Sequence, residues 1–213
     1  METQKLSFRK LKKSEYEVFY NSLKCAREHN EHGLYVILRD KKLYKDTKNF
    51  LLGDGIAGFA IDGNEFISVH KNPDKAHQHN IGKVFPEMVS LAFKNGAEAG
   101  DCYDEFLAEY HMSCGFIAVA SVPFNDIYDN PDNWDSNRFG KPNVYILARA
   151  IKNDQELNKL KKENKLLHFA DIKPYIKTIE DYDEALAYRD KLLEKFRNMN
   201  YDQVANFVLN NNS

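Results

Sequence analysis

The sequence predicts one α/β domain followed by a helical extension. Residues 56–116 carry most of this prediction, because they read as strand, turn, strand, polar loop, helix, strand and helix. After Lys152 the chain becomes rich in lysine and contains no further glycine. A length of 213 residues is enough for one such domain with an extension. We therefore expect an α/β domain over residues 1–150 and a helical extension over residues 151–213.

Composition narrows the class of protein. Hydrophobic residues make up 43% of the chain, which is ordinary globular usage, so a real core can form. A net charge of −2 does not suggest a nucleic-acid-binding protein, which usually has a basic face. Three cysteines are too few for a disulfide framework, and no run approaches the ~20 apolar residues of a membrane span. The charged segment Met1–Lys13 does not resemble a secretory signal. We expect a soluble cytoplasmic protein without nucleic-acid or membrane partners.

The first elements are a strand and a helix. Lys5 to Leu11 alternates apolar and polar residues and predicts a strand. Ser14 is placed as the N-cap of a helix that runs to about Glu28, with acidic residues in the first turn. Residues 34–38 could form a strand or a short buried helix, because periodicity does not decide between them.

A hairpin is expected next. Asn49 to Leu52 is an extended run, and it is followed by a turn. Ile56 to Ile61 and Phe66 to His70 are apolar enough to pair as two strands around Asp62-Gly63-Asn64.

A polar loop, Lys75 to Lys83, connects this hairpin to an amphipathic helix over residues 85–97. A glycine-containing loop at a helix start can bind a phosphate, because the first helical turn has unpaired N–H groups and a positive dipole end. The alternative is an ordinary helix start without a ligand. The histidine pair His77 and His79 would need further metal ligands, and none stands at a zinc-like spacing, so we expect no metal site.

The remaining elements are short apolar strands and capped or amphipathic helices. They are a strand over 97–103, a helix over 105–114 capped by Asp104, a strand over 116–122, a polar loop over 125–141 that contains Trp134, a strand over 144–148 and a helix over 181–198.

In this order the motifs resemble the GCN5-related N-acetyltransferase (GNAT) superfamily. "LSFRKL" looks like the opening strand, "GIAGFAIDGNEFISVH" like the central hairpin and "HQHNIGKVFPEMVSLAFKNGA" like the pyrophosphate loop and its helix. "DCYDEFLAEYHMSCGF" resembles the next strand and helix, and with "NVYILAR" the match covers residues 5–149. The resemblance implies a mixed, mostly antiparallel central sheet flanked by helices. "DCYD" and "VPFND" look most like a divergent phage and mobile-element branch, which implies a bacterial or phage-infected cell.

The resemblance also implies an activity, the transfer of an acetyl group from acetyl-coenzyme A (acetyl-CoA) to an amine of a protein or a small molecule. His77 stands at the first position of the family's phosphate loop, and Asn80 stands where the family has its first glycine. The residues implied to bind the cofactor are Ser68 and Val69 in the strand and His77, Asn80, Ile81, Gly82, Lys83 and Val84 in the loop.

The family's catalytic tyrosine stands four residues before the closing glycine. His111 occupies that position, and Tyr110 is one residue away, about 100° around the helix. Either side chain could give a proton to the departing thiolate, although His111 could instead be a helix histidine against the core. Glu65 or His70 could help to deprotonate the amine, and the strand around Val69 could offer an N–H group to the thioester oxygen.

Two departures from the family pattern leave a second function open. The loop lacks the family's first glycine, and a histidine replaces its tyrosine. The chain could therefore be a GNAT-shaped binding or inhibitor module of a phage or mobile element, without turnover. A homo-oligomer that assembles through the helical extension is a further alternative.

Overall fold

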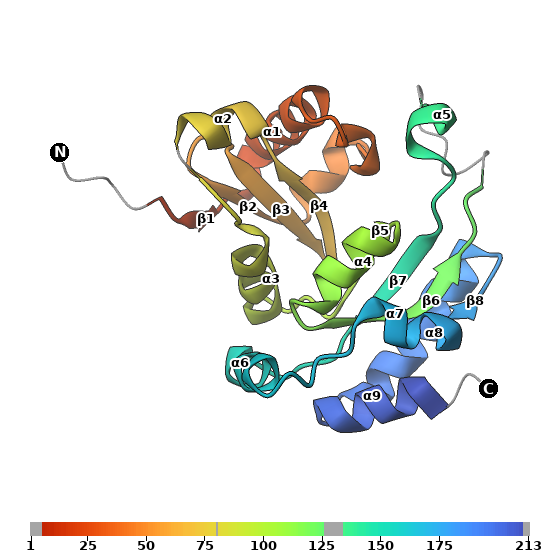
Figure 1. The fold of residues 1–213 in the computed structure, drawn as a ribbon. Coiled ribbons are helices and arrows are strands. Elements are labelled where there is room, and N and C mark those ends of the chain that lie inside the picture. Colours follow the sequence, from red (N-terminus) through yellow and green to blue (C-terminus); the bar gives the residue numbers. More distant parts are fainter. Residues whose placement is uncertain (1–5, 80, 126–133, 211–213) are drawn as a thin grey trace. The chain divides into compact units, whose positions relative to one another are not determined.

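A computed structural model describes residues 6–79, 81–125 and 134–210 (Figure 1). The chain divides into two compact units, Met1–Ala97 and Glu98–Ser213. Each unit contains strands and the helices that pack on them, so the mixed α/β class is confirmed. The expected boundary at residue 150 stays a prediction.

The first unit contains an antiparallel sheet with the strand order β1-β2-β3-β4. Its strands are β1 (Phe8–Lys10), β2 (Lys48–Leu52), β3 (Ala57–Asp62) and β4 (Glu65–Lys71). The β3–β4 hairpin turns over Gly63-Asn64, where Gly63 has a φ of +58° that suits glycine. The hairpin and the extended run before it are confirmed.

The helices of the first unit are α1 (Tyr16–His29), α2 (Pro73–Gln78) and α3 (Phe85–Lys94). Helix α1 packs on β2, β3 and β4, and its apolar side forms a core with strand residues. That core contains Leu11, Phe19, Leu23, Tyr44, Leu51, Ala60 and Ile67.

Three expectations about this unit were wrong. Ser14 does not cap α1, because it lies inside a 3-10 turn over Lys13–Glu15, and the carboxylate of Glu15 accepts the N–H of Lys12 at 2.8 Å. Residues 34–38 form neither a strand nor an α-helix, and the chain there begins with a 3-10 turn over Gly33–Tyr35.

The third correction is that the polar loop is shorter than expected, because α2 occupies its first part. Asn72 caps this helix by accepting the N–H of Lys75 at 3.0 Å, and Pro73 stands in the first turn. These are ordinary helix-start signals. After α3, Gly96 has a φ of +98°, and the N–H of Ala97 donates to Ala92 O at 3.0 Å, so a glycine closes the end of this helix.

The second unit contains a sheet with the strand order β5-β7-β6-β8. Its strands are β5 (Ala99–Tyr103), β6 (Phe116–Val122), β7 (Val144–Arg149) and β8 (Lys177–Thr178). Strand β7 is antiparallel to β5 and β6, whereas β8 is parallel to β6. The first three strands and the mostly antiparallel pairing were predicted. Strand β8 was not, because two exposed polar residues carry no strand pattern.

Helices of the second unit are α4 (Glu105–Met112), α5 (Ser136–Phe139), α6 (Asp154–Lys162), α7 (Phe169–Ile172), α8 (Tyr182–Phe196) and α9 (Tyr201–Asn210). Asp104 caps α4 as predicted, since its Oδ1 accepts the N–H of Leu107 at 2.8 Å. Helices α4 and α8 both pack on β6 and β7. No helix in the described part of the chain is long and apolar enough to cross a membrane.

Candidate functional site

Strand β4 is interrupted by a bulge at Ser68-Val69. Ala60 pairs with Ile67 and Gly58 pairs with His70, so Phe59 faces two residues of β4 instead of one. Ser68 has a φ of +54°, in the left-handed region that residues other than glycine avoid. A bulge leaves a residue out of the ladder and is common next to active sites. It falls on the two strand residues that were expected to bind the cofactor.

Buried side chains surround the bulge. The hydroxyl of Tyr44 lies 2.8 Å from Ser68 Oγ, and Nδ1 of His70 lies 3.0 Å from Ser68 O. Nε2 of His70 lies 3.0 Å from Ser22 Oγ. Since a carbonyl oxygen only accepts, Nδ1 of His70 carries the proton and Nε2 accepts from Ser22. Burial lowers the pKa of His70 to about 4, so this ring is neutral at pH 7. His70 is therefore committed to the bulge and is a poor base for the amine.

Helix α3 begins without a capping side chain. Its N-cap residue is Val84, which brings no side-chain hydrogen bond to the first turn. Before it, the carbonyl of Gly82 accepts a hydrogen bond from Nζ of Lys71 at 2.8 Å. A Cβ atom added at Gly82 would meet no atom within 4 Å, so this side of the loop is open. An uncapped helix start beside a lysine is an arrangement that attracts an anion.

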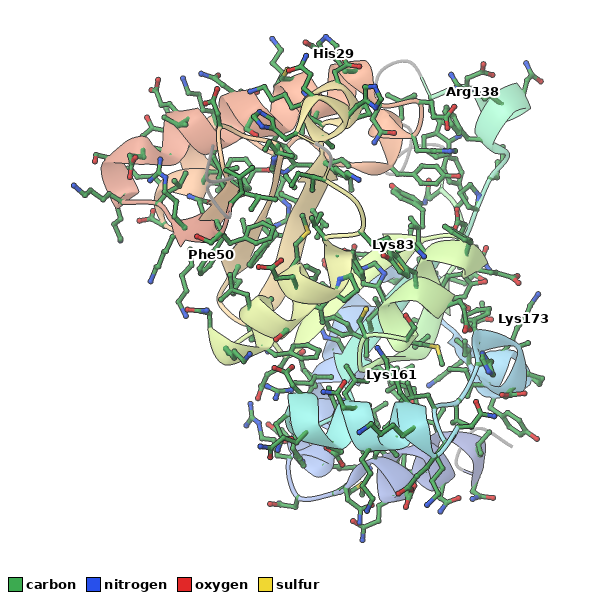
Figure 2. All side chains as sticks on the ribbon, turned by 60° about the vertical axis from the view of Figure 1, so that its left-hand side comes forward. His29, Phe50, Lys83, Arg138, Lys161 and Lys173 are labelled. Atoms are coloured by element: carbon green, nitrogen blue, oxygen red, sulfur yellow. The ribbon has the colours of Figure 1, made fainter. Side chains whose placement is uncertain are left out.

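The loop residues differ in what they can offer an anion. The N–H of Ile81 donates to Ala76 O at 2.8 Å, which removes it from the N–H groups expected to hold a phosphate. Val84 is buried, whereas its neighbour Lys83 is exposed. Figure 2 labels Lys83. Lys71 was missed by the sequence analysis. The feature that could have identified Lys71 is its position as the last residue of β4, two residues before α2.

The first part of the expected loop offers fewer groups to an anion than the residues just before α3. His77 lies exposed in α2, and Asn80 lies outside the described residues. Lys75 points its Nζ at Asp54, with 2.5 Å to the backbone oxygen and 3.8 Å to the carboxylate. Glu65 is half-buried at the start of β4, paired across the hairpin with Asp62.

In the second unit, His111 is buried in α4. Its Nδ1 lies 2.8 Å from Leu107 O, and its ring packs edge-on against Phe116 at 5.8 Å between centroids. Burial lowers the pKa of His111 to about 4. The ring is neutral at pH 7, and its one N–H is engaged with a backbone oxygen. This geometry favours the alternative of a helix histidine against the core.

Tyr110 is the better proton donor of the two. It is half-buried in α4, and burial raises its pKa above the usual value of 10, so the phenol keeps its proton at pH 7. The preceding residue, Glu109, fixes the helix to α7. Its carboxylate accepts the N–H of Phe169 at 2.5 Å and lies 2.9 Å from Nδ1 of His168.

Two buried cysteines and a buried tryptophan of the second unit have structural explanations. Burial raises the pKa of both Cys102 and Cys114, so neither thiol is an activated nucleophile. Trp134 is buried against Tyr103, Phe124 and Phe139, and its Nε1 donates to Gly140 O at 3.0 Å. Within the described ranges, no group of three or more histidine, cysteine, aspartate or glutamate side chains could hold a metal ion.

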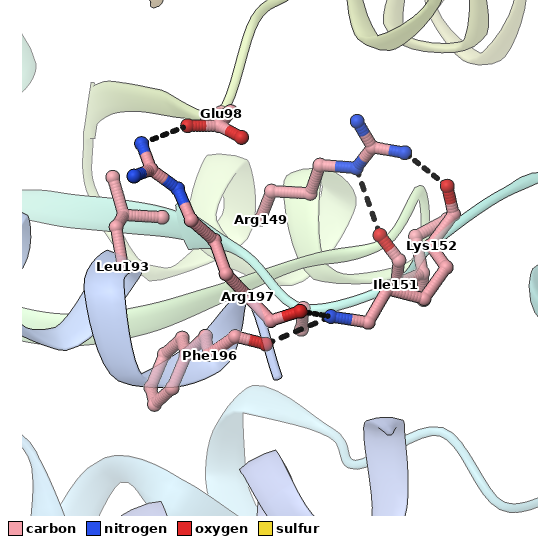
Figure 3. Close-up of a pocket in the computed structure, with 8 residues that line it drawn as sticks. Glu98, Arg149, Ile151, Lys152, Leu193, Phe196 and Arg197 are labelled. Atoms are coloured by element: carbon pink, nitrogen blue, oxygen red, sulfur yellow. Dashed lines mark hydrogen bonds and ion pairs between the residues drawn. The ribbon is translucent and has the colours of Figure 1, made fainter. Parts of the chain in front are cut away.

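A cavity of about 220 Å³ lies in the second unit between the end of β7 and the end of α8 (Figure 3). Its cationic side chains already contact protein atoms. Arg149 donates to the carbonyls of Ile151 and Lys152, and Arg197 pairs with Glu98 at 3.1 Å. Nζ of Lys152 donates to two carbonyls at the end of α8 at 2.8 Å each. These contacts close the helix end, which is a structural role.

Comparison with known proteins finds similarity in structure only. No protein-family model and no curated protein sequence matches the chain. YjaB from Escherichia coli, in its apo form, is 12% identical with a TM-score of 0.41 over 68% of this chain and 98% of that chain. YncA from Salmonella typhimurium, a candidate acetyltransferase solved with its cofactor acetyl-CoA, is 11% identical with a TM-score of 0.41 over 68% and 92%.

A candidate acetyltransferase of the GNAT family from Desulfovibrio desulfuricans is 8% identical, with a TM-score of 0.38 over 67% of this chain and 96% of that chain.

Proposed function

We propose that the chain is a GNAT-type N-acetyltransferase that moves an acetyl group from acetyl-CoA to an amine. One observation carries the proposal: within the first unit, a bulged strand leads through α2 to an uncapped helix start. Acetyl-CoA needs an anion site for its pyrophosphate and hydrogen-bond donors for its thioester. The start of α3 supplies the first, and the bulge at Ser68-Val69 supplies the second.

The phosphate contacts are proposed for the backbone N–H groups from Gly82 into the first turn of α3. Lys71 holds the Gly82 carbonyl and places a positive charge at the loop, and exposed Lys83 adds another. Both charges favour a bound anion over water. His77 and Asn80 are further proposed contacts, on the resemblance alone.

The proposed reaction needs little covalent chemistry from the protein. The amine nitrogen attacks the thioester carbon, a backbone N–H of the β4 bulge stabilises the oxyanion, and the carbon–sulfur bond breaks. The proton for the departing thiolate is assigned to the phenol of Tyr110 on the resemblance alone. Glu65, directly or through water, takes the proton that the amine loses.

A thermal-shift titration tests cofactor binding. We expect acetyl-CoA to stabilise the fold, because a ligand at 100 times its Kd adds about 2.7 kcal/mol to the free energy of unfolding. That free energy corresponds to several degrees in melting temperature. Matched titrations with free pantetheine and with ATP show whether both ends of the cofactor contribute. No shift at millimolar acetyl-CoA would remove the proposal.

The second candidate function is a coenzyme A-binding module without turnover. The buried, neutral His111 at the position of the family's tyrosine favours it. The two functions differ in one measurement: a module binds acetyl-CoA but releases no thiol with any amine or protein acceptor. For either function we propose a cytoplasmic location and an acceptor or partner that meets the protein there.

A further inference from the structure

We propose that Tyr44 and His70 are positioning residues that hold the β4 bulge in the conformation that receives the cofactor. This inference rests on the function proposed above, and it adds two residues that contact the bulge without contacting the reacting atoms. Tyr44 lies outside the motifs that resemble the family, and His70 is the last residue of the hairpin motif, where the resemblance suggested it only as a base for the amine. Tyr44 lies in the 3-10 turn Lys41–Lys45, and His70 lies two residues after Ser68 in β4.

The bulge conformation needs to be held. Ser68 has a φ of +54°, which a side chain with a Cβ atom disfavours, so an isolated serine would return to an extended backbone. Two buried groups oppose this return. The hydroxyl of Tyr44 binds the side chain of Ser68 at 2.8 Å, and the imidazole of His70 binds its carbonyl at 3.0 Å. Ser68 is thus fixed from both its side chain and its backbone.

The two clamping side chains are themselves fixed by packing. Tyr44 is 0% exposed, and its ring lies 5.3 Å from that of Phe19. His70 is 4% exposed, lies edge-on to the same Phe19 ring at 5.4 Å, and accepts from Ser22. The imidazole also depends on Gly58 of the neighbouring strand, where a Cβ atom would stand 2.6 Å from His70 Cε1. Helix α1, through Phe19 and Ser22, therefore controls the geometry of the bulge.

The alternative explanation is that these polar groups merely satisfy one another inside the core. Both explanations predict that loss of a hydroxyl lowers stability. Only the positioning role predicts that the loss weakens binding of one part of the cofactor and not of the other. A disturbed bulge should weaken binding of the pantetheine and acetyl part, while binding at the start of α3 should not change.

The experiment compares two ligands by calorimetry. One is acetyl-CoA, and the other is adenosine 3′-phosphate 5′-diphosphate, which keeps the pyrophosphate and lacks the pantetheine arm. In Tyr44→Phe we expect the Kd for acetyl-CoA to rise about fivefold, the worth of one hydrogen bond, and the Kd for the nucleotide to stay unchanged. Tyr20→Phe is the control, because Tyr20 belongs to the same apolar cluster and its ring lies 6.0 Å from that of Tyr44.

Ser68→Ala provides a second variant, should Tyr44→Phe fail to fold. It removes the other partner of the same hydrogen bond, so it should reproduce the selective loss, and the double variant should lose little more. Equal losses for both ligands, or no loss beyond that of Tyr20→Phe, would overturn the positioning role while leaving the cofactor proposal intact. A wild-type protein that binds neither ligand would instead refute the proposed function, and this inference with it.

Discussion

At the scale of residues, burial decides which candidate side chains can act. His70 and His111 both look like acid–base residues in the sequence, but each is at least nine-tenths buried and donates its one N–H to a backbone carbonyl. Tyr110, by contrast, is half-buried and stays protonated at pH 7. The candidate position for an anion is the loop before α3, where a Cβ atom added at Gly82 would meet no atom within 4 Å.

Gly82→Glu should abolish the acetyl-CoA thermal shift while the protein stays folded. A Cβ at this position meets open space, so the fold tolerates the change, but the added carboxylate repels a phosphate. Gly82→Ala is the matched control and should keep most of the shift. Full binding by Gly82→Glu in calorimetry would mean that the anion site lies elsewhere.

The buried histidines predict a loss of stability in acid. Both pKa values are lowered to about 4 from 6.5, so the unfolded chain binds more protons between these values. Their contribution is therefore fully present above pH 6.5 and is lost as the pH falls through 6.5 towards 4. We expect the difference in unfolding free energy between pH 7 and pH 4.5 to be smaller in His111→Leu than in wild type, as measured by urea denaturation. An unchanged difference would show that His111 does not titrate as described.

At the scale of elements, the rotation of helix α4 determines which of two adjacent side chains, Tyr110 or His111, is buried in the core. Residues next to each other on a helix point about 100° apart, so turning His111 into the core leaves Tyr110 on a different face. The Asp104 cap and the contact of Glu109 with α7 fix the rotation of this helix. The choice between the two candidates thus follows from how the element packs.

Tyr110→Phe should lower kcat by about 10²–10⁴ and leave the affinity for acetyl-CoA nearly unchanged, because it removes only the acidic proton. His111→Leu should keep kcat within a few-fold of wild type at a temperature where it is folded. Thiol release with a panel of amine and protein acceptors provides the measurement. Full kcat in Tyr110→Phe would assign proton transfer to solvent or to another group.

At the scale of the whole molecule, the residues after Lys152 complete the second unit. Strand β8 pairs with β6, and α8 packs on β6 and β7 with Leu192, Leu193 and Phe196 buried. Arg189 of the same helix is also buried. These contacts cover apolar faces of strands that come from the first 150 residues.

Truncation after Lys152 should therefore unfold or aggregate the second unit, because it exposes the apolar faces of β6 and β7 to water. Truncation after Asn210 is the control and should change nothing. Hydrogen exchange would locate the effect. Retained protection of the β6 and β7 amides in the shorter chain would show that residues 151–213 form an independent addition.

Much of the fold was predictable because its signals are local. Short apolar runs located β2, β3, β4 and β6, and a single capping residue, Asp104, marked the start of α4. The start of α2 was equally local, in Asn72-Pro73, but was hidden by the assumption of a loop. The proposed phosphate loop and the two candidates on α4 came from the resemblance of the ordered motifs to the GNAT superfamily.

Tertiary structure alone decided the rest. Nothing near Ser68 in the sequence indicates a left-handed residue, because the groups that hold it come from Tyr44, 24 residues earlier, and from a ring that needs Gly58. The neutral state of His111 depends on burial against Phe116, and β8 exists only because β6 offers it a partner. Periodicity and caps depend on a few neighbours along the chain, whereas pKa values, bulges and strand pairing depend on neighbours that only folding brings close.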